Sequence, residues 1–339
     1  MTDTRPATTG LDTLDRLLQP FGRLVNYWYP VAWSKDVGDE PLAVKLLDTP
    51  VVLWRSRGEI VAFYDLCVHR GTPLSFGRVN EDGEIVCAYH GWHYCITGEC
   101  TWIPSRPPDR PIPPNARAIR FSVEERHGLI WVCLGEPEAG IPSFPPEFES
   151  EAFWGRGTFD EIWKCNAARF IENMADTSHF AWVHPGVFGT PEKPIVNAFA
   201  ITEVEGGLRY ECTEPIGHMV EPDQPHIRSY ELTFPFMILF RTRQPGREER
   251  EVVWYVCSPV DSRTTRFFQF LLKNYQHPMP PEERSQLVRT IQAQDRRMVE
   301  AQRPEELPLD LREELHLRGP DDVALRYRKM LRGLGVDWS

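Results

Sequence analysis

Two short segments of the chain pair a cysteine with a histidine at spacings suited to metal binding. Cys67 and His69 form a C-x-H pair, Cys87 and His90 form a C-x2-H pair, and 17 residues separate the two pairs. Thiolate sulfur and imidazole nitrogen are protein ligands of zinc and of several iron centres. The four residues therefore predict a metal centre built from two loops, each at the end of a strand.

Two kinds of centre could use this set of ligands. All four side chains could hold one zinc ion tetrahedrally. Alternatively, the two thiolates could hold one iron of a [2Fe–2S] cluster while the two imidazoles hold the other. Zinc sites usually use C-x2-C pairs, whereas here Gly71 and Gly91 follow mixed pairs and allow the backbone to bend closely around a cofactor. These features favour the iron–sulfur cluster, with zinc as the alternative.

A second set of candidate ligands lies in the segment NAARFIENMADTSHFAWVHPG. The pattern predicts a helix over 166–183 with Asn166 as its N-cap, since an asparagine side chain can accept a free backbone N–H. Asn173, Asp176 and His179 follow at intervals of three residues. They are therefore expected along one flank of this helix.

His184 can join His179 only if the helix is interrupted. Five residues apart on a continuous helix, the two side chains would point about 140° away from each other. Pro185 disfavours helical geometry at the residue before it, so the chain can unwind there and bring the imidazole back. Two histidines could then share one metal ion.

An oxygen-activating iron also needs a carboxylate and open coordination positions. In a predicted helix over 281–303, Leu287, Ile291, Asp295 and Met298 recur at spacings of four, four and three, so Asp295 interrupts a stripe expected to be buried. An ionised carboxylate on an apolar face is costly unless a cation compensates it. A salt bridge to a nearby arginine is the alternative, but the two histidines favour a metal ion.

The elements that position these residues divide the chain into two folded parts. Runs rich in β-branched and aromatic residues, such as PVVLWR, IVAFYD, EIVCAY and GLIWVCL, predict an antiparallel β-sandwich ending near Gly135. A helical stretch, further strands and two late helices then predict an α+β domain. The expected organisation is an N-terminal arm at 1–25, a cluster domain at 26–137, a proline-rich linker at 138–150 and an iron domain at 151–339.

The cysteine–histidine segment, with its flanking HRGTPL and YHGW, resembles the Rieske family of [2Fe–2S] proteins. Rieske subunits of cytochrome bc complexes have a disulfide that joins the two cluster loops, but the corresponding residues here are Thr72 and Tyr89. A Rieske ferredoxin or a Rieske oxygenase therefore remains. A ferredoxin would need only the part of the chain up to Gly135.

From Asn26 onward, the chain resembles the catalytic (alpha) subunit of Rieske non-haem iron oxygenases, in the single-subunit-type branch with phthalate, vanillate and dicamba oxygenases. This resemblance implies a helix-grip (START-like) catalytic domain, in which a central antiparallel sheet wraps a long helix over a mononuclear Fe(II). It implies the cluster ligands Cys67, His69, Cys87 and His90 and the iron ligands His179, His184 and Asp295.

The resemblance also implies a path for electrons. Asp176 is expected to bind no iron, but to bridge His179 to His90 of a neighbouring subunit. Electrons would then cross a subunit interface, which requires a head-to-tail ring, usually a homotrimer. Asn173 matches a position near the iron.

The implied activity is oxygenation of a small organic substrate by O2. A separate reductase would pass electrons from NADH or NADPH to the cluster, and the chain has no G-x-G-x-x-G motif of its own for a nucleotide. The branch favours monooxygenation, including O- or N-demethylation. Ring cis-dihydroxylation is one alternative, and a Rieske electron-transfer protein without oxygenase chemistry is the alternative from another class.

One further segment, ELTFPFMILFRTR, is expected to contribute strands to the substrate pocket. Arg241 or Arg243 in this segment could bind a carboxylate of the substrate. The alternative is that both arginines lie on the surface, as most arginines do.

Composition narrows the range of partners. A net charge of −11 gives no electrostatic reason to bind nucleic acid or an anionic membrane. The sequence shows no signal-peptide pattern and no run of about 18 apolar residues, so we expect a cytoplasmic protein without membrane contact. The eight cysteines are thinly spread, which favours thiols or metal ligands over a disulfide framework.

Overall fold

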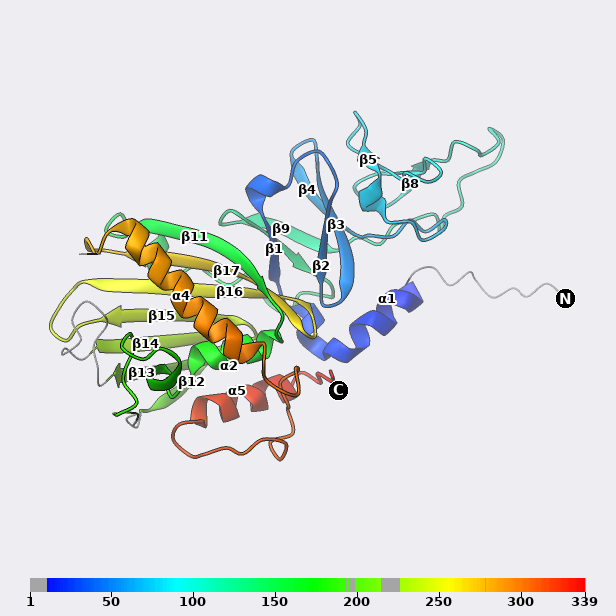
Figure 1. Cartoon of the computed structure of the whole chain (residues 1–339). Coiled ribbons are helices and arrows are strands. Elements are labelled where there is room, and N and C mark those ends of the chain that lie inside the picture. Colours follow the sequence, from blue (N-terminus) through cyan, green and yellow to red (C-terminus); the bar gives the residue numbers. More distant parts are fainter. Residues whose placement is uncertain (1–10, 193, 195–198, 215–225, 278, 339) are drawn as a thin grey trace. The chain divides into compact units, whose positions relative to one another are not determined.

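The computed structural model describes residues 11–192, 194, 199–214, 226–277 and 279–338 of the chain (Figure 1). The chain forms two compact units. The first comprises Met1–Pro142 with Val336–Trp338, and the second comprises Ser143–Gly335. The boundary after Pro142 falls inside the segment 138–150, which the sequence suggests as a linker.

The first unit contains three small antiparallel sheets with the strand orders β1-β10-β9, β2-β3-β4 and β5-β6-β7-β8. Their valine, isoleucine and aromatic side chains suit a pleated surface with one buried face. A helix and a 3-10 segment, α1 (Leu11–Leu18) and η1 (Gln19–Asn26), precede the sheets. The strands are β1 (Tyr29–Trp33), β2 (Leu42–Leu46), β3 (Thr49–Ser56), β4 (Glu59–Tyr64), β5 (Arg78–Val79), β6 (Ile85–Val86), β7 (His93–Tyr94), β8 (Cys100–Trp102), β9 (Ser122–Arg126) and β10 (Leu129–Cys133), with short 3-10 turns η2 (Ser34–Asp36) and η3 (Leu74–Phe76).

Strands β4 and β6 lead into the two cysteine–histidine loops. The chain leaves β4 at Tyr64, three residues before Cys67. The predicted strand EIVCAY is shorter than expected, because β6 ends at Val86. The backbone turns at Cys87, whose carbonyl accepts the N–H of Gly91 at 3.0 Å, and a turn of this kind cannot continue the strand ladder.

The second unit is built on a seven-stranded antiparallel sheet in the order β11-β17-β16-β15-β14-β13-β12. In β14, fully buried residues alternate with partly buried ones, which is the period of two expected when one face of a strand is covered. Five successive hairpin connections order β12 to β17, and β11 adds to the outer edge of β17. The strands are β11 (Trp154–Trp163), β12 (Ile201–Val204), β13 (Gly207–Glu214), β14 (His226–Thr233), β15 (Met237–Arg243), β16 (Arg250–Asp261) and β17 (Thr264–Lys273).

Helices cover one face of this sheet. In Figure 1, α4 (Pro281–Val299) lies across the strands, with α2 (Ala167–Ala175) beside it. Helix α2 packs against β15, β16, β17 and α4, and against α5 (Asp322–Arg332). A short helix, α3 (Phe180–Val183), follows α2. This sheet wrapped around helices, preceded by a β unit, confirms the predicted α+β fold class.

The first half of the predicted helix 166–183 is correct. Asn166 caps α2 as expected, because its Oδ1 accepts the N–H of Ala168 at 2.9 Å. Its Nδ2 also donates to the carbonyl of Ser262 at 2.7 Å, which fixes the helix start against the strand connection. Two hydrogen bonds of the Asn166 side chain therefore fix the N-terminus of α2.

The second half of that prediction is wrong, because the helix is not continuous. Helix α2 ends at Ala175, where the carboxylate of Asp176 accepts the backbone N–H groups of Ser178 and His179 at 2.9 and 3.0 Å. Such local side-chain bonds compete with the helical pattern. The expected alignment of Asn173, Asp176 and His179 along one helical flank therefore does not occur.

The predicted apolar stripe of α4 also needs correction. Met298 is 41% exposed, so it does not belong to a buried stripe. Leu287 and Ile291 are half-buried, and the fully buried positions of the helix are Arg284, Gln292, Asp295 and Val299. The buried face is largely polar because it borders a cavity, described below, rather than a close-packed core.

The segment that follows the unit boundary is packed onto the sheet. The rings of Phe144 and Phe148 contact Trp254 and Phe270 edge to face, with centroid distances of 4.4 to 5.9 Å. Phe148 is the last residue of a 3-10 turn, η4 (Pro146–Phe148). This part of the chain belongs structurally to the second unit.

Candidate iron centres

The two cysteine–histidine loops share one backbone pattern. The N–H groups of Cys67 and Cys87 donate to the carbonyl five residues further on, at 2.8 and 2.9 Å. The N–H groups of Gly71 and Gly91 donate back to the cysteine carbonyls at 2.9 and 3.0 Å. Both glycines have positive φ, +73° and +66°, which glycine adopts at low cost. Each loop is therefore a tight turn around its cysteine.

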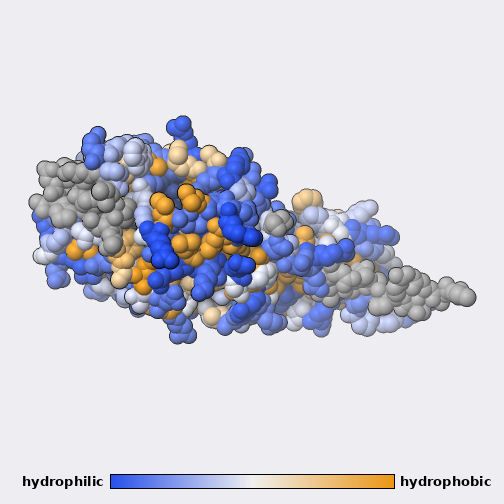
Figure 2. All heavy atoms as spheres, turned by 90° about the horizontal axis from the view of Figure 1, so that it is seen from below, coloured by the Kyte–Doolittle hydropathy of each residue, from blue (hydrophilic) through white to orange (hydrophobic). Residues whose placement is uncertain are grey.

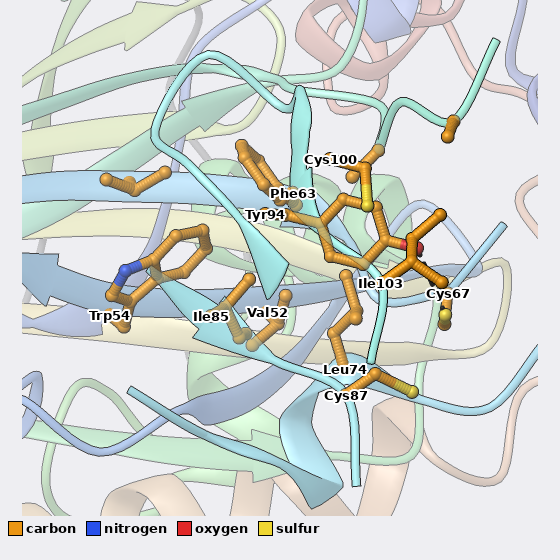
Figure 3. Close-up of a cluster of buried hydrophobic side chains, with 13 residues drawn as sticks. Val52, Trp54, Phe63, Cys67, Leu74, Ile85, Cys87, Tyr94, Cys100 and Ile103 are labelled. Carbon is orange, nitrogen blue, oxygen red and sulfur yellow. Dashed lines mark hydrogen bonds between the residues drawn. The ribbon is translucent and has the colours of Figure 1, made fainter. Parts of the chain in front are cut away.

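The two cysteines lie at one end of the core of the first unit. Each is 2% exposed, and Figure 3 shows them beside Leu74 and Tyr94. The hydroxyl of Tyr94 lies 3.2 Å from Sγ of Cys67. Burial, with a contribution from Cys87, raises the pKa of the Cys67 thiol. Two thiolates in this core would require a positively charged partner, which a metal centre supplies.

The two histidines form the outer side of the same site. The ring centroids of His69 and His90 are 4.5 Å apart, and His69 stacks on Trp92 at 4.5 Å. His90 is exposed, next to Tyr89, which is 63% exposed. Nδ1 of His69 is buried and has no hydrogen-bond partner in the described chain. A buried polar atom without a partner is uncommon, and here it fits a metal ligand.

The arrangement distinguishes between the two predicted kinds of centre. Ligands of one zinc ion converge closely, but within the described residues the set whose donor atoms lie within 4.8 Å of one another is His179, His184 and Asp295. The four loop residues form no such set. Their donors, two buried sulfurs and two outer imidazoles, suit a two-iron cluster with unlike ends.

His179, His184 and Asp295 meet in the second unit. Nε2 of His179 and Nε2 of His184 lie 3.4 and 3.0 Å from the same Oδ1 of Asp295. His184 is 1% and Asp295 5% exposed. The chain unwinds between α2 and His179 and again at His184, which ends α3 with φ −120° and ψ 51°. Two histidines and one carboxylate could hold one metal ion and leave positions open for other ligands.

A second acceptor orients each histidine ring. Nδ1 of His179 donates to Oδ2 of Asp176 at 2.9 Å, and Nδ1 of His184 donates to Oε1 of Gln294 at 2.8 Å. Since Nδ1 carries the proton in each ring, Nε2 is the atom directed towards Asp295. The sequence reasoning did not identify Gln294. The one feature of the sequence that could have pointed to Gln294 is its position next to Asp295 in α4.

The charges of this site call for a cation. Burial opposes protonation of His179, but the carboxylates of Asp176 and Asp295 outweigh burial and raise its pKa to about 9. Burial also opposes ionisation of Asp295, but the two histidines outweigh burial and lower its pKa to about 2. The proton on His179 and the hydrogen bonds to Asp295 stand where ligand-to-metal bonds would form. The donor set therefore fits a divalent ion.

A cavity of about 430 Å³ opens beside these three residues, within the size range of sites for small molecules. Asn173, His179, His184 and Asp295 are among the residues that line it. The expected place of Asn173 close to the iron stays a prediction. The apolar lining of the cavity includes Phe180, Phe188, Phe240, Val253, Leu271 and Ile291, and its polar lining includes Arg228, Tyr255, Gln269 and Gln292. The predicted pocket strand contributes Phe240, Thr242 and Arg243.

The two arginines of that strand differ. Arg241 has a 17% exposed side chain that forms ion pairs with Glu147 and Glu231, so it is neither a surface residue nor a substrate ligand. Arg243 lines the cavity, 3.6 Å from Glu211, and its side chain is 37% exposed. Only Arg243 of this pair is placed to meet a ligand.

Two global features also bear on the expectations from sequence. All eight cysteines are free thiols in the described chain. No described helix combines the length and the apolar character needed to cross a membrane. Hydrophilic side chains dominate the face seen in Figure 2, with hydrophobic side chains gathered in smaller patches among them.

Comparison with known proteins agrees with both centres. Residues 27–124 match the Rieske [2Fe–2S] domain, and residues 163–336 match the vanillate O-demethylase oxygenase C-terminal domain. The methylxanthine N1-demethylase NdmA of Pseudomonas putida is 33% identical over 92% of this chain and 89% of its own. The methylxanthine N3-demethylase NdmB of the same species is 28% identical over 96% of this chain and 93% of its own.

Solved structures extend this likeness to three dimensions. NdmA with caffeine superimposes with a TM-score of 0.78 at 30% identity, covering 94% of this chain and 91% of that one. Dicamba monooxygenase bound to dicamba superimposes with a TM-score of 0.75 at 21% identity, covering 92% of this chain and 98% of that one. This likeness shows the shared fold.

The fold and the two ligand sets thus define an iron–sulfur domain joined to a mononuclear iron domain. The chain belongs to the Rieske non-haem iron oxygenases, as a catalytic subunit. Enzymes of this family are oxidoreductases with a [2Fe–2S] cluster and a mononuclear iron, and use O2 and electrons from NAD(P)H through a separate reductase. The predicted oxygenase is confirmed. The electron-transfer alternative is wrong, because the second unit is an oxygenase domain.

Proposed function

We propose that this chain is the oxygenase component of a demethylating monooxygenase. The observation that carries the proposal is the convergence of two histidines and a carboxylate on a cavity of about 430 Å³. In this proposal Fe(II) is held by His179, His184 and Asp295, and the [2Fe–2S] cluster by Cys67, His69, Cys87 and His90.

The two metal groups, when bound, supply single electrons and a centre that activates O2. The residues of the chain hold the metal groups and orient the rings that bind them. Asp176 and Gln294 fix the rings of His179 and His184 through Nδ1, so both Nε2 atoms stay directed at the metal position. Asn173 lines the same cavity as these ligands.

The reaction we propose is oxidation of a methyl group on nitrogen or oxygen. One atom of O2 enters a methyl C–H bond, the other leaves as water, and two electrons and two protons are consumed. The resulting hydroxymethyl group breaks its bond to the heteroatom and leaves as formaldehyde, while the heteroatom takes the proton. Relatives named as methylxanthine demethylases and dicamba O-demethylase support this choice over ring dihydroxylation.

We further propose a head-to-tail homotrimer in which Asp176 contacts His90 of a neighbouring subunit. The exposure of both residues supports this proposal. The side chain of Asp176 remains 30% exposed while it binds His179, and His90 is exposed on the outer side of its loop. Asp176→Asn should leave the mass of the assembly unchanged and slow electron transfer between subunits.

The proposed electron donor is a separate NAD(P)H-dependent reductase, and the proposed location is the cytoplasm. Eight cysteines without a disulfide, two of them proposed cluster ligands, are suited to a reducing compartment.

The function can be tested with the purified protein, a Rieske-type reductase and NADH. We expect a red-brown protein with one chelator-labile iron beyond its cluster. An N- or O-methylated substrate should stimulate NADH oxidation and give formaldehyde in equal amount. A cis-diol product would show that the enzyme dihydroxylates a ring and does not demethylate. The absence of labile iron would contradict the proposed iron site.

A further inference from the structure

A buried polar group in the cavity wall plays no part in holding either metal. Tyr255 and Gln269 are directly opposite each other on β16 and β17, and both line the cavity. Gln292 reaches them from α4, and its Nε2 donates to Oε1 of Gln269 at 2.5 Å. Their exposures are 7%, 2% and 4%. Three polar side chains are therefore gathered in the interior without an ion to explain them.

This group satisfies only part of the Gln292 amide, which contacts the side chains of both Gln269 and Tyr255. Oε1 of Gln292 is shielded from water and has no hydrogen-bond partner within the described chain. An acceptor left in this state is unfavourable unless another molecule completes it. The last torsion of a glutamine side chain is broad, so a small rotation turns Oε1 towards a ligand in the cavity that Gln292 lines.

A second atom complements this acceptor. Nδ2 of Asn173, on α2, is also buried and has no partner in the described chain, and Asn173 lines the same cavity. The cavity thus offers one acceptor and one donor. A lactam or imide ring carries both an N–H group and a carbonyl, and so offers one partner to each of these atoms.

We propose that Gln292 is a specificity-determining residue that accepts a ring N–H of the substrate, and that the substrate class is a small oxo-heterocycle with a lactam or imide N–H. This inference rests on the proposed demethylase function and deepens it. Gln292 lies three residues before Asp295 in α4, so a ligand bound to it lies next to the metal position.

Theobromine and caffeine test the proposal directly. They differ in one position, where theobromine has a ring N–H and caffeine has N–CH3. We expect the iron-loaded protein to bind theobromine on the order of tenfold more tightly in calorimetry, because caffeine leaves Oε1 without a donor. Gln292→Met should lower the affinity for theobromine to that for caffeine, and Gln292→Glu, which keeps an acceptor, should retain a preference.

The control is Gln286→Met, at an exposed glutamine on the same helix, which should keep the wild-type ratio. Cluster absorbance and iron content establish that each variant is folded and loaded. Equal binding of the two compounds by the wild type, an unchanged ratio in Gln292→Met, or no binding of either compound would overturn the inference. A different result would contradict the demethylase function: a protein that retains its labile iron would release no formaldehyde from any methylated compound.

Discussion

Asp176 binds His179 at two points, because its Oδ2 accepts both the ring Nδ1–H at 2.9 Å and the backbone N–H at 3.0 Å. The same carboxylate ends helix α2 through the N–H of Ser178. One side chain therefore sets both the path of the backbone and the direction of the imidazole. We therefore expect the proposed iron site to depend on this residue, although it does not lie among the three converging donors.

Asp176→Asn should preserve iron and cluster but reduce turnover. The amide oxygen can replace Oδ2, but the amide nitrogen cannot accept the N–H of Ser178, and the side chain carries no charge to support the imidazole. Loss of such a partner typically lowers activity about 10–100-fold. Turnover and metal content would be measured side by side. Asp160→Asn on β11 is the matched control and should keep normal turnover. Normal turnover in Asp176→Asn would remove the residue from the site.

Asp295→Ala should abolish iron binding and leave the cluster intact. The variant removes the carboxylate that both Nε2 atoms face, and the side chain it removes is only 5% exposed. We expect a red-brown protein with two irons per chain instead of three. A third iron that resists chelation would contradict the assignment of Asp295 as a ligand.

Gln294 provides a test that is independent of the ligands. Gln294→Met removes the acceptor of His184 Nδ1–H at similar volume and should weaken iron affinity about 10–100-fold. Gln294→Glu offers a stronger acceptor and should retain iron. The measurement is iron retention during titration with a chelator, and equal retention in both variants would show that this contact does not matter.

Tyr94→Phe should lower the reduction potential of the cluster. The hydroxyl lies 3.2 Å from Sγ of Cys67, and hydrogen bonds to cluster sulfurs stabilise the reduced state. Loss of a bond of this kind is expected to shift a one-electron potential by roughly 50 mV. Redox titration of the cluster absorbance would measure the shift, and an unchanged potential would show that the hydroxyl does not donate to the cluster.

Acidification should destabilise the second unit through His277. Burial, with Arg284 and Lys273, lowers the pKa of His277 to about 4, whereas an unfolded histidine titrates near 6.5. The folded state therefore favours the neutral ring. Its stabilising effect is complete above about pH 6.5 and is lost as the pH falls towards 4.

Denaturant unfolding at pH 7 and pH 5 would measure this effect. His277→Gln cannot be protonated, so the free energy of unfolding should fall by about 1–2 kcal/mol less between these two pH values than in the wild type. Equal losses in both proteins would show that His277 contributes nothing to the pH dependence.

The candidate ligand sets could be proposed from sequence because most of their members are close together in the chain. Cys67 and His69 share one turn, Cys87 and His90 share another, and His179 and His184 are five residues apart. Local spacing of this kind carries chemical information. Asp295 could be found through its place in a helical pattern, although Met298, part of the same pattern, is exposed.

The remaining features depend on contacts between distant residues. The break after Ala175 arises because a carboxylate competes for backbone N–H groups, and helix propensity does not report that competition. The contact of Gln294 with His184 spans 110 residues of sequence, and the ion pairs of Arg241 with Glu147 span 94. Pairings over such distances leave no period in the sequence, so only the folded chain shows them.

Helix α4 contributes Gln292, Gln294 and Asp295 within a single turn. A mutation that shifts this helix to admit a new compound would move the metal's carboxylate and the support of His184 by a similar amount. Evolution of substrate range without loss of iron must therefore proceed mainly through the strands opposite, where Phe240, Thr242 and Val253 can change independently of the ligands.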